Sequence, residues 1–323
     1  MTNTKKFENE HRGEVAEGSQ EELSHDVAQR EARKRTTRGI ICALVGGTCW
    51  GISGTCASYL FDSFGVSSLW LTCYRQLCAG IMFLIFAAIT DRTHLKALWT
   101  TPRDLIIVAF FAVFGLAFNQ LAYLRAIQLT NAGTATVLQC LALVFVMIYS
   151  CLSARRPPRK REFAGLILAI SGTYFIATGG NPSTLLLPVD GFIAGICAAL
   201  GSACLSIIPM RILPKYGTPI VTGSGMLVAG ILLSMIERPW ETPFVFDVAG
   251  WIVFAILIVV GSFLAYFLYM QGVKDIGSMR ASLLGTSEPI SATVTSALLL
   301  GVAFAPTDIL GFALIIAMIF LTA

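Results

Sequence analysis

Long apolar stretches alternate with short charged segments along most of the chain. Seven long stretches carry no charged side chain: Gly39–Phe61, Leu105–Leu124, Ala126–Ala154, Phe163–Val189, Gly191–Met210, Tyr216–Ile236 and Val248–Val273. Three further apolar runs are Val66–Thr90, which contains Arg75, Met279–Gly301, which contains Glu288, and Thr307–Ala323. A helix needs about 20 residues to cross a hydrocarbon core of about 30 Å, and lipid leaves no partner for backbone groups outside helices. The pattern therefore predicts an all-α polytopic membrane protein with ten transmembrane helices.

The composition agrees with a membrane protein and sets the first 38 residues apart. Of the 323 residues, 55% are hydrophobic and 13% are charged, whereas soluble proteins carry about 25% charged residues. Residues 1–38 hold eight Lys or Arg and eight Asp or Glu, with almost no aromatic or β-branched residues. We therefore expect residues 1–38 to form a disordered tail. We do not expect a secretory signal, because this polar region is too long.

Lys and Arg residues lie almost entirely on one side of the predicted helices. The tail and the loops after the second, fourth, sixth and eighth spans hold 20 of them, whereas the opposite side holds only Arg125 and Arg238. The side that is richer in Lys and Arg faces the cytoplasm. We therefore expect a multi-pass protein of the plasma or inner membrane with both termini in the cytoplasm. This bias explains the net charge of +4, so no nucleic-acid partner is needed.

The second half of the chain repeats the first. An offset of 146 residues aligns residues 113–175 with the later sequence without a gap and pairs Tyr123 with Tyr269. An offset of 150 residues aligns the earlier part and pairs Gly51 with Gly201. Since each copy has five spans, an odd number, the second copy must enter the membrane from the opposite side. Inverted repeats of this kind are typical of secondary transporters with a substrate site near the membrane midplane.

The cysteines and histidines predict neither a metal site nor a bound cofactor. Nine cysteines fall in or at the edge of the predicted spans, and none of them forms a CxxC pair. The three histidines, His11, His25 and His94, lie outside the spans. We therefore interpret the cysteines as small apolar packing residues.

Three stretches of the sequence resemble those of a known family. They read "CWGISGTCASYLF" in the first span, "NAGTATVLQCLALVFVMIYSCLSARRPPRKREFAG" across the fourth and fifth, and "RASLLGTSEPISATVTSALLLG" in the ninth. They are similar to the EamA-type branch of the drug/metabolite transporter superfamily. The resemblance covers about residues 38–323 and implies two inverted five-helix repeats, at 39–180 and 188–323, around a central cavity. It also implies export or exchange of small metabolites, often amino acids, without ATP, and the chain has no GxxxxGK[ST] motif.

The chain departs from this family at two places. Leu143 stands where the first repeat of the family often has a proline, whereas its counterpart in the second repeat is Pro289. The acidic residue that the family often carries late in the fourth or ninth span is absent from 150–156 and from 296–302. We therefore expect an interrupted helix in the ninth span only, and we assign no coupling role to those late positions.

Two of the 42 charged residues, Arg75 and Glu288, lie deep within predicted spans. Each is about nine residues, or roughly 13 Å, from one end of its span, which places it near the membrane midplane. A charge at this depth costs at least about 2.5–3.5 kcal/mol, so such residues normally face a cavity or a partner.

The sequence leaves several interpretations of these two residues open. Glu288 binds a proton that drives transport, binds an amine on the substrate, or, with Ser287, caps the half-helix that restarts at Pro289. Arg75 binds a substrate carboxylate, pairs permanently with Glu288, or extends outward to the interface.

Polar and aromatic residues with helical spacing extend the candidate substrate-binding site. Ser262, Tyr266 and Tyr269 follow one another at i, i+4 and i+7 in the eighth span. The remaining candidates for substrate contact are Gln120, Tyr123, Gln139, Trp50 and Ser53. The two glutamines should face protein or a cavity, because an amide in lipid has no partner. For the aromatic residues, packing or a place at the membrane interface is the alternative to substrate contact.

These features predict a secondary active transporter that exports small organic metabolites such as amino acids by alternating access between the two repeats. Its partners are then a small-molecule substrate and the lipid bilayer. One alternative is efflux of multiple drugs or other cationic compounds. Another class is a membrane-embedded enzyme that modifies lipids, and a third is a receptor that transports nothing. Such an enzyme would carry His, Asp or Cys clusters at an interface, and the sequence shows none, so we do not expect an enzyme.

Overall fold

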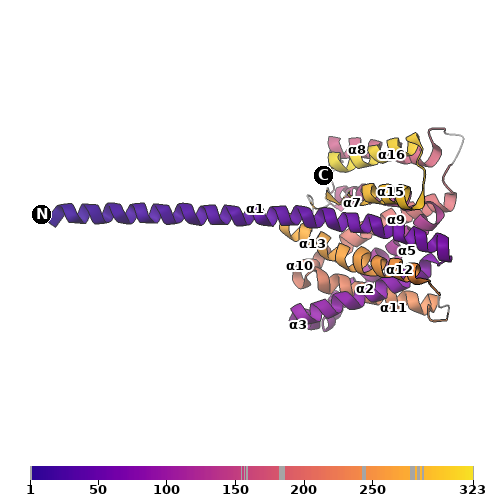
Figure 1. The fold of residues 1–323 in the computed structure, drawn as a ribbon, viewed down its shortest axis with the longest axis horizontal. Helices are drawn as coiled ribbons and strands as arrows, with labels where there is room; N and C mark the ends of the chain where they lie inside the picture. Colours follow the sequence, from indigo (N-terminus) through magenta and orange to yellow (C-terminus); the bar gives the residue numbers. More distant parts are fainter. Residues whose placement is uncertain are drawn as a thin grey trace.

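The computed structural model is helical and gathers its helices into one bundle, from which the N-terminal helix projects (Figure 1). It describes residues 2–153, 155, 157, 159–181, 186–241, 245–276, 281, 284–285 and 287–322. Side chains are described for all of these except 2–28, 150, 162, 273, 319 and 322.

Seven helical segments within the described residues are long and apolar enough to cross a membrane. They are Gln29–Phe64, Ser68–Thr90, Pro102–Leu129, Ala132–Ser153, Val189–Arg211, Thr218–Glu237 and Val248–Ile276. Three shorter helices lie beside them: α8 (Lys160–Thr178), α15 (Ser287–Leu300) and α16 (Pro306–Thr322). An all-helical membrane protein is therefore confirmed, whereas the number of ten spans stays a prediction.

Two of the spanning segments contain a stretch of π-helix at equivalent positions of the sequence repeat. In the first, α4 (Pro102–Phe110) passes through η1 (Phe111–Ala117) into α5 (Phe118–Leu129). In the second, α12 (Val248–Ile258) passes through η3 (Val259–Leu264) into α13 (Ala265–Ile276). Gly115 of η1 and Gly261 of η3 are partners in the 146-residue offset. A π-helical turn redirects the side chains that follow it, and such turns are frequent at functional sites.

The fourth span is interrupted as well as the ninth, so the expectation of a single interruption was wrong. The helix α6 (Ala132–Gln139) ends before α7 (Ala142–Ser153), and Leu141 N donates to Leu138 O at 3.0 Å, only three residues back. In the second half, Glu288 N donates to Gly285 O at 3.0 Å, directly before a proline.

No proline explains the break between α6 and α7, but two side chains near it compete for helix carbonyls. The hydroxyl of Thr136 donates to Ala132 O at 2.6 Å, and the thiol of Cys140 donates to Thr136 O at 3.4 Å. Such bonds weaken and bend a helix. No proline therefore marks this break in the sequence, and the bonds near it form only in the folded helix.

Helices of the two halves pack against each other in related pairs. The second helix of the first half, α2 (Ser68–Thr90), packs on α11 (Thr218–Glu237), and α8 packs on α16. The helix α1 (Thr2–Phe64) packs on α13 and α15, and α9 (Val189–Ile207) packs in the corresponding way on α5, α6 and α7. The arrangement is thus unchanged when the roles of the two halves are exchanged.

The contact between α2 and α11 follows the same relation residue by residue. A Cβ added to Gly80 would come within 2.6 Å of Leu227 N, and a Cβ added to Gly230 would come within 2.8 Å of Leu77 N. The 150-residue offset pairs Gly80 with Gly230 and Leu77 with Leu227, so one contact occurs twice. Close approach through glycine is the usual way in which membrane helices pack.

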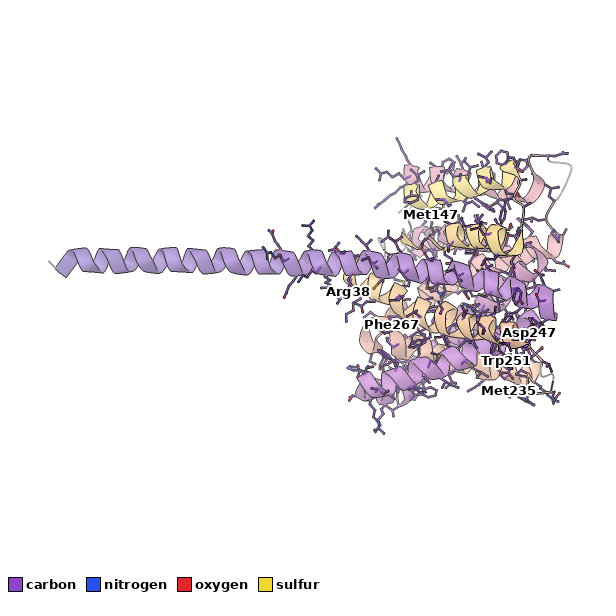
Figure 2. All side chains as sticks on the ribbon, viewed as in Figure 1. Arg38, Met147, Met235, Asp247, Trp251 and Phe267 are labelled. Carbon is purple, nitrogen blue, oxygen red and sulfur yellow. The ribbon has the colours of Figure 1, made fainter. Side chains whose placement is uncertain are left out.

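The N-terminal region differs from the expected disordered tail. Residues Thr2–Phe64 form one helix of 63 residues, which extends far beyond the bundle (Figure 1). Glu, Lys, Arg, Ala and Gln, which dominate this region, are good helix formers. The membrane-spanning part of α1 supplies the helix nucleus, so its extension needs no further nucleation. Arg38 lies where α1 leaves the bundle, and Asp247 and Trp251 lie at the opposite end (Figure 2).

Candidate substrate-binding site

Arg75 lies in the interior of the bundle, on the second turn of α2. The hydroxyl of Ser67 accepts a hydrogen bond from Trp70 N at 3.0 Å and thereby caps the start of this helix. Arg75 is only 5% exposed, and its Nε donates to Ser262 Oγ at 3.1 Å. Among the residues that the structure describes, no acceptor is bound by its buried Nη1. Arg75 therefore does not extend outward, and part of its guanidinium is available to a ligand.

The π-helical stretch η3 positions Ser262 for this contact. Ser262 is 3% exposed, and its hydroxyl donates to Leu257 O, five residues earlier, at 3.2 Å. Because the proton of the hydroxyl points back along the helix, its lone pairs are free to accept from Arg75. The irregular helix thus aims a neutral acceptor at the buried cation, instead of a carboxylate that would neutralise it.

Trp50 forms an aromatic wall with two tyrosines of α13. Its ring lies 4.9 Å from that of Tyr266 in an edge-on arrangement at 78°, and 4.9 Å from that of Tyr269 at 47°. Tyr266 is buried, and its hydroxyl reaches the side-chain amide of Gln120. The structure thus brings together four of the residues that the sequence proposed: Trp50, Tyr266, Tyr269 and Gln120.

Three buried polar atoms from three helices near Ser262 and the aromatic wall have no hydrogen-bond partner in the described residues. They are Arg75 Nη1, Ser53 Oγ and Gln120 Oε1. Ser53 packs directly on Gly261, next to Ser262. A buried donor or acceptor without a partner costs about 1–3 kcal/mol. A cluster of such atoms offers a ligand one cationic donor, one amide acceptor and one hydroxyl.

Glu288 stands in the first turn of α15 and is half-buried. Its charge interacts with that of Arg75 and lies near the hydroxyls of Tyr123 and Tyr266. The structure has no direct ion pair between Arg75 and Glu288, both of which it describes. Arg75 of α2 and Glu288 of α15 therefore interact through their charges without forming a direct ion pair.

The capping interpretation of Ser287 and Glu288 finds no hydrogen bond in the described residues. The hydroxyl of Ser287 donates to Leu44 O of α1 at 3.0 Å, so it ties α15 to α1. The backbone N–H of Glu288 bonds to Gly285 O, and the structure gives its carboxylate no bond to a helix N–H. The carboxylate is therefore free for a proton or a substrate amine.

Tyr123 and Gln139 occupy fixed positions beside this cluster. The hydroxyl of Tyr123, which is 6% exposed, lies 2.9 Å from Thr136 Oγ1. Gln139 Nε2 donates to Asn119 Oδ1 at 3.0 Å, and Asn119 is 1% exposed. Gln139 is thus held by α5. Tyr123, by contrast, interacts with the charge of Arg75.

Sequence reasoning missed Asn119, and it placed Thr295 on the polar face of the ninth span but missed its partners Thr55 and Ser296. The Oγ1 atoms of Thr55 and Thr295 are 2.6 Å apart, and Ser296 Oγ lies 3.4 Å from Thr55. The signal for Asn119 was an amide side chain in an apolar run, directly before Gln120. Thr55 carried no such signal, because a threonine in a membrane helix commonly bonds to its own backbone.

Aromatic rings pack the bundle on the Asp247 side of Arg75. Trp70, five residues before Arg75, packs with its ring tilted against Tyr74 at 4.4 Å and against Phe254 at 5.8 Å. Phe246 extends the cluster at 6.0 Å from Trp70. Since Trp70, Phe246 and Phe254 are all buried, this cluster separates Arg75 from that end of the bundle.

The described residues contain no group of three or more His, Cys, Asp or Glu side chains that could hold a metal ion. The nine cysteines are free and are distributed over the helices rather than gathered at one place. The site offers a ligand one cation, one carboxylate, amides, hydroxyls and aromatic rings.

Ionisable side chains inside a helical membrane bundle typically mark a substrate or ion pathway, which agrees with a transporter. The chain belongs to the EamA-like transporter family, whose model matches it twice, at residues 37–178 and 190–323. It is 32% identical over 286 residues to YicL of Salmonella typhimurium, described as an inner membrane transporter, which covers 88% of this chain and 95% of that protein.

Other relatives are more distant. YwfM of Bacillus subtilis, described as a transporter, is 21% identical over 84% of this chain and 88% of its own length. A protein of known crystal structure has the same fold, with a TM-score of 0.59 and 17% identity over 90% of this chain and 96% of that one. The relatives are named as transporters, which favours transport over the enzyme alternative.

Proposed function

We propose that the protein is a secondary active transporter that exports small organic metabolites such as amino acids. Arg75 binds a carboxylate of the substrate, and Glu288 binds its amine or a coupling proton. The rings of Trp50, Tyr266 and Tyr269 pack against the apolar part of the substrate. No nucleotide or metal takes part, and the free energy for transport comes from a gradient.

The observation that carries this proposal is that the guanidinium of Arg75 has a buried N–H donor without an acceptor among the described residues. A buried guanidinium normally has its donors paired, because an unpaired charge in the interior is costly. Here one donor is directed to the neutral Ser262 Oγ, and Nη1 has no acceptor in the described residues. A carboxylate that entered the site would complete the coordination with strong, charge-assisted bonds.

The membrane arrangement we propose has ten spans in two inverted repeats, residues 39–180 and 188–323, in a plasma or inner membrane with both termini in the cytoplasm. The related helix pairs, the two π-helical stretches and the two helix breaks support the repeat. The excess of Lys and Arg on one side supports the orientation. Alternating access then exposes the site between the repeats to one side at a time.

The test uses the purified full-length protein in proteoliposomes and a panel of labelled amino acids, organic amines and organic acids. We expect saturable counterflow of one or more zwitterionic compounds, which Arg75→Gln abolishes and Arg125→Gln leaves intact. Arg125 is an exposed arginine that contacts Gln128. If no zwitterion is transported but acids or amines are, the substrate class is wrong; if nothing in the panel is transported by the folded protein, the proposed class of metabolite is rejected.

A second candidate, efflux of cationic compounds, is favoured by the aromatic wall beside an unpaired carboxylate. Tryptophan and tyrosine faces attract cations, and Glu288 supplies the opposite charge. Arg75 repels a cation without a carboxylate, which distinguishes the two candidates. Arg75→Gln should raise the transport of a cationic dye if this second function holds, and should not raise it if the substrate is zwitterionic.

A further inference from the structure

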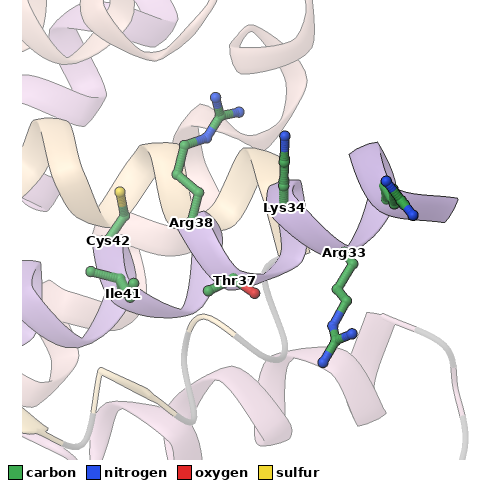
Figure 3. Close-up of a pocket in the computed structure, with 7 residues that line it drawn as sticks. Arg33, Lys34, Thr37, Arg38, Ile41 and Cys42 are labelled. Carbon is green, nitrogen blue, oxygen red and sulfur yellow. The ribbon is translucent and has the colours of Figure 1, made fainter. Parts of the chain in front are cut away.

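A basic groove lies on α1 at the point where this helix leaves the bundle. It has a volume of about 650 Å³ and is lined by Arg30, Arg33, Lys34, Thr37, Arg38, Ile41 and Cys42 (Figure 3). Arg33 and Lys34 extend to different sides of the helix, and Thr37 and Arg38 stand on the following turn. The transport site does not use this groove, because Arg75 lies deep in the bundle.

The cations of this groove differ in how they are held. Arg38 donates to both carboxylate oxygens of Asp275, at 2.8 and 3.0 Å, which fixes it to α13. Arg30, Arg33 and Lys34 are exposed, and no described residue forms an ion pair with them. These three cations stand on two turns of α1 beside one exposed acid, Glu31, and none of them is ion-paired with a carboxylate among the described residues.

The face that carries these cations continues as an apolar face into the membrane span. Ile41, Leu44 and Val45 follow at helical spacing and are 55%, 38% and 42% exposed. Lys34 and Ile41 are seven residues apart, or about 10 Å at 1.5 Å per residue. The headgroup region on each side of a bilayer is about 5–8 Å thick, and long basic side chains reach several ångströms along the helix. The charged part of the face thus lies at headgroup level, and the apolar part beside the acyl chains.

We propose that this groove binds an anionic phospholipid of the adjoining leaflet. Arg30, Arg33 and Lys34 bind the phosphate oxygens, and the hydroxyl of Thr37 donates to the same group. The acyl chains lie along Ile41, Leu44 and Val45. Because Arg38 joins this part of α1 to α13, the bound lipid also holds both helices at one depth in the membrane.

Native mass spectrometry of the full-length protein in neutral detergent tests this proposal with phosphatidylglycerol and phosphatidylcholine. We expect one phosphatidylglycerol to bind at least about tenfold more tightly than phosphatidylcholine, since each basic residue near an anionic surface contributes roughly a factor of five. The triple variant Arg30→Gln/Arg33→Gln/Lys34→Gln should lose this preference. The conservative variant Arg30→Lys/Arg33→Lys should keep most of it, which excludes a general loss of folding.

A matched control variant, Arg92→Gln/Lys96→Gln/Arg103→Gln, removes two arginines and one lysine that are exposed elsewhere. We expect its affinity for phosphatidylglycerol to change less than about twofold, because these residues lie outside the groove. Equal losses in both triple variants would mean diffuse attraction and would overturn the proposal. Equal binding of the two lipids by the unmodified protein would overturn it too. Displacement of the lipid by glycerol 3-phosphate alone would also do so, because it would make the groove a site for soluble phosphates.

Discussion

Arg75 and Ser262 join α2 to the π-helical stretch η3 inside this transporter, where Arg75 Nε donates to the serine hydroxyl at 3.1 Å. The bond orients the guanidinium without neutralising it, since a hydroxyl carries no charge. A carboxylate at position 262 would have formed a closed ion pair. A serine leaves the charge of Arg75 available to a substrate.

Replacing Arg75 separates a binding role from a structural one. Arg75→Met should lower substrate affinity by roughly 10- to 100-fold, because a hydrogen bond to a charged group contributes about 1.5–3 kcal/mol. The same change should leave the melting temperature equal or higher, since it removes a buried and incompletely paired charge. Both quantities can be measured on one sample, by substrate-dependent thermal shift.

The control for this variant is Arg125→Met, which removes an exposed arginine from the same half of the chain. It should change neither substrate affinity nor melting temperature by a measurable amount. A large fall in the melting temperature of Arg75→Met, with substrate affinity unchanged, would show that Arg75 only holds the helices together.

Glu288→Gln tests whether this carboxylate couples transport to protons. An amide has the same shape but binds no proton, so flux driven by a pH gradient should fall to the background of empty liposomes. Exchange of substrate for substrate without a gradient should continue. The matched control is Glu241→Gln, an exposed residue paired with Arg238, which should leave both rates unchanged. Undiminished gradient-driven flux in Glu288→Gln would contradict proton coupling through this residue.

The helical membrane fold could be predicted from the sequence because charge is excluded from spans by a large free-energy cost. Arg75 and Glu288 were found for the same reason, as exceptions to that rule. The break after Gln139 could not be predicted, because it depends on how Thr136 and Cys140 share backbone carbonyls in the folded helix. A pattern of apolar residues carries no information about such local competition.

The contacts between the site residues could not be predicted from the sequence either. Ser262 stands at i, i+4 and i+7 spacing with Tyr266 and Tyr269, but the π-helical turn that aims it at Arg75 has no composition signal. Asn119 is another example, because its bond to Gln139 joins residues 20 positions apart on different helices. Sequence periodicity gives the face on which a residue lies, and tertiary packing decides what that face meets.

Asp275 should contribute more to stability than an exposed acid of the same kind. Its side chain is 1% exposed and accepts two hydrogen bonds from Arg38 and one from Gln271 at 3.1 Å. Asp275→Ala should therefore lower the free energy of unfolding by about 1–3 kcal/mol. Glu241→Ala, which breaks a pair whose side chains are 63% and 55% exposed, should lower it by less than about 0.5 kcal/mol. Equal shifts of the melting temperature in the two variants would contradict this ranking.

Gly51 is the position where an added methyl group should do most damage. A Cβ there would overlap Ser291 Oγ and come within 2.5 Å of Glu288 O and 2.7 Å of Ala292 N. Backbone atoms of α15 cannot rotate away, so Gly51→Ala must push α1 from the helix that carries Glu288. We expect a loss of about 1–3 kcal/mol in stability, together with reduced transport.

Gly195→Ala is the matched comparison for Gly51→Ala, because it adds the same methyl group at another helix contact. There the nearest atom is Leu138 Cδ1 at 2.6 Å, the end of a side chain that can change rotamer, and the fixed Leu138 Cβ stands farther away at 3.0 Å. Its melting temperature should therefore fall less than that of Gly51→Ala, and its transport rate should stay closer to that of the unmodified protein. If the two alanine variants behave alike, the close approach of α1 to the backbone of α15 is not what makes Gly51 necessary.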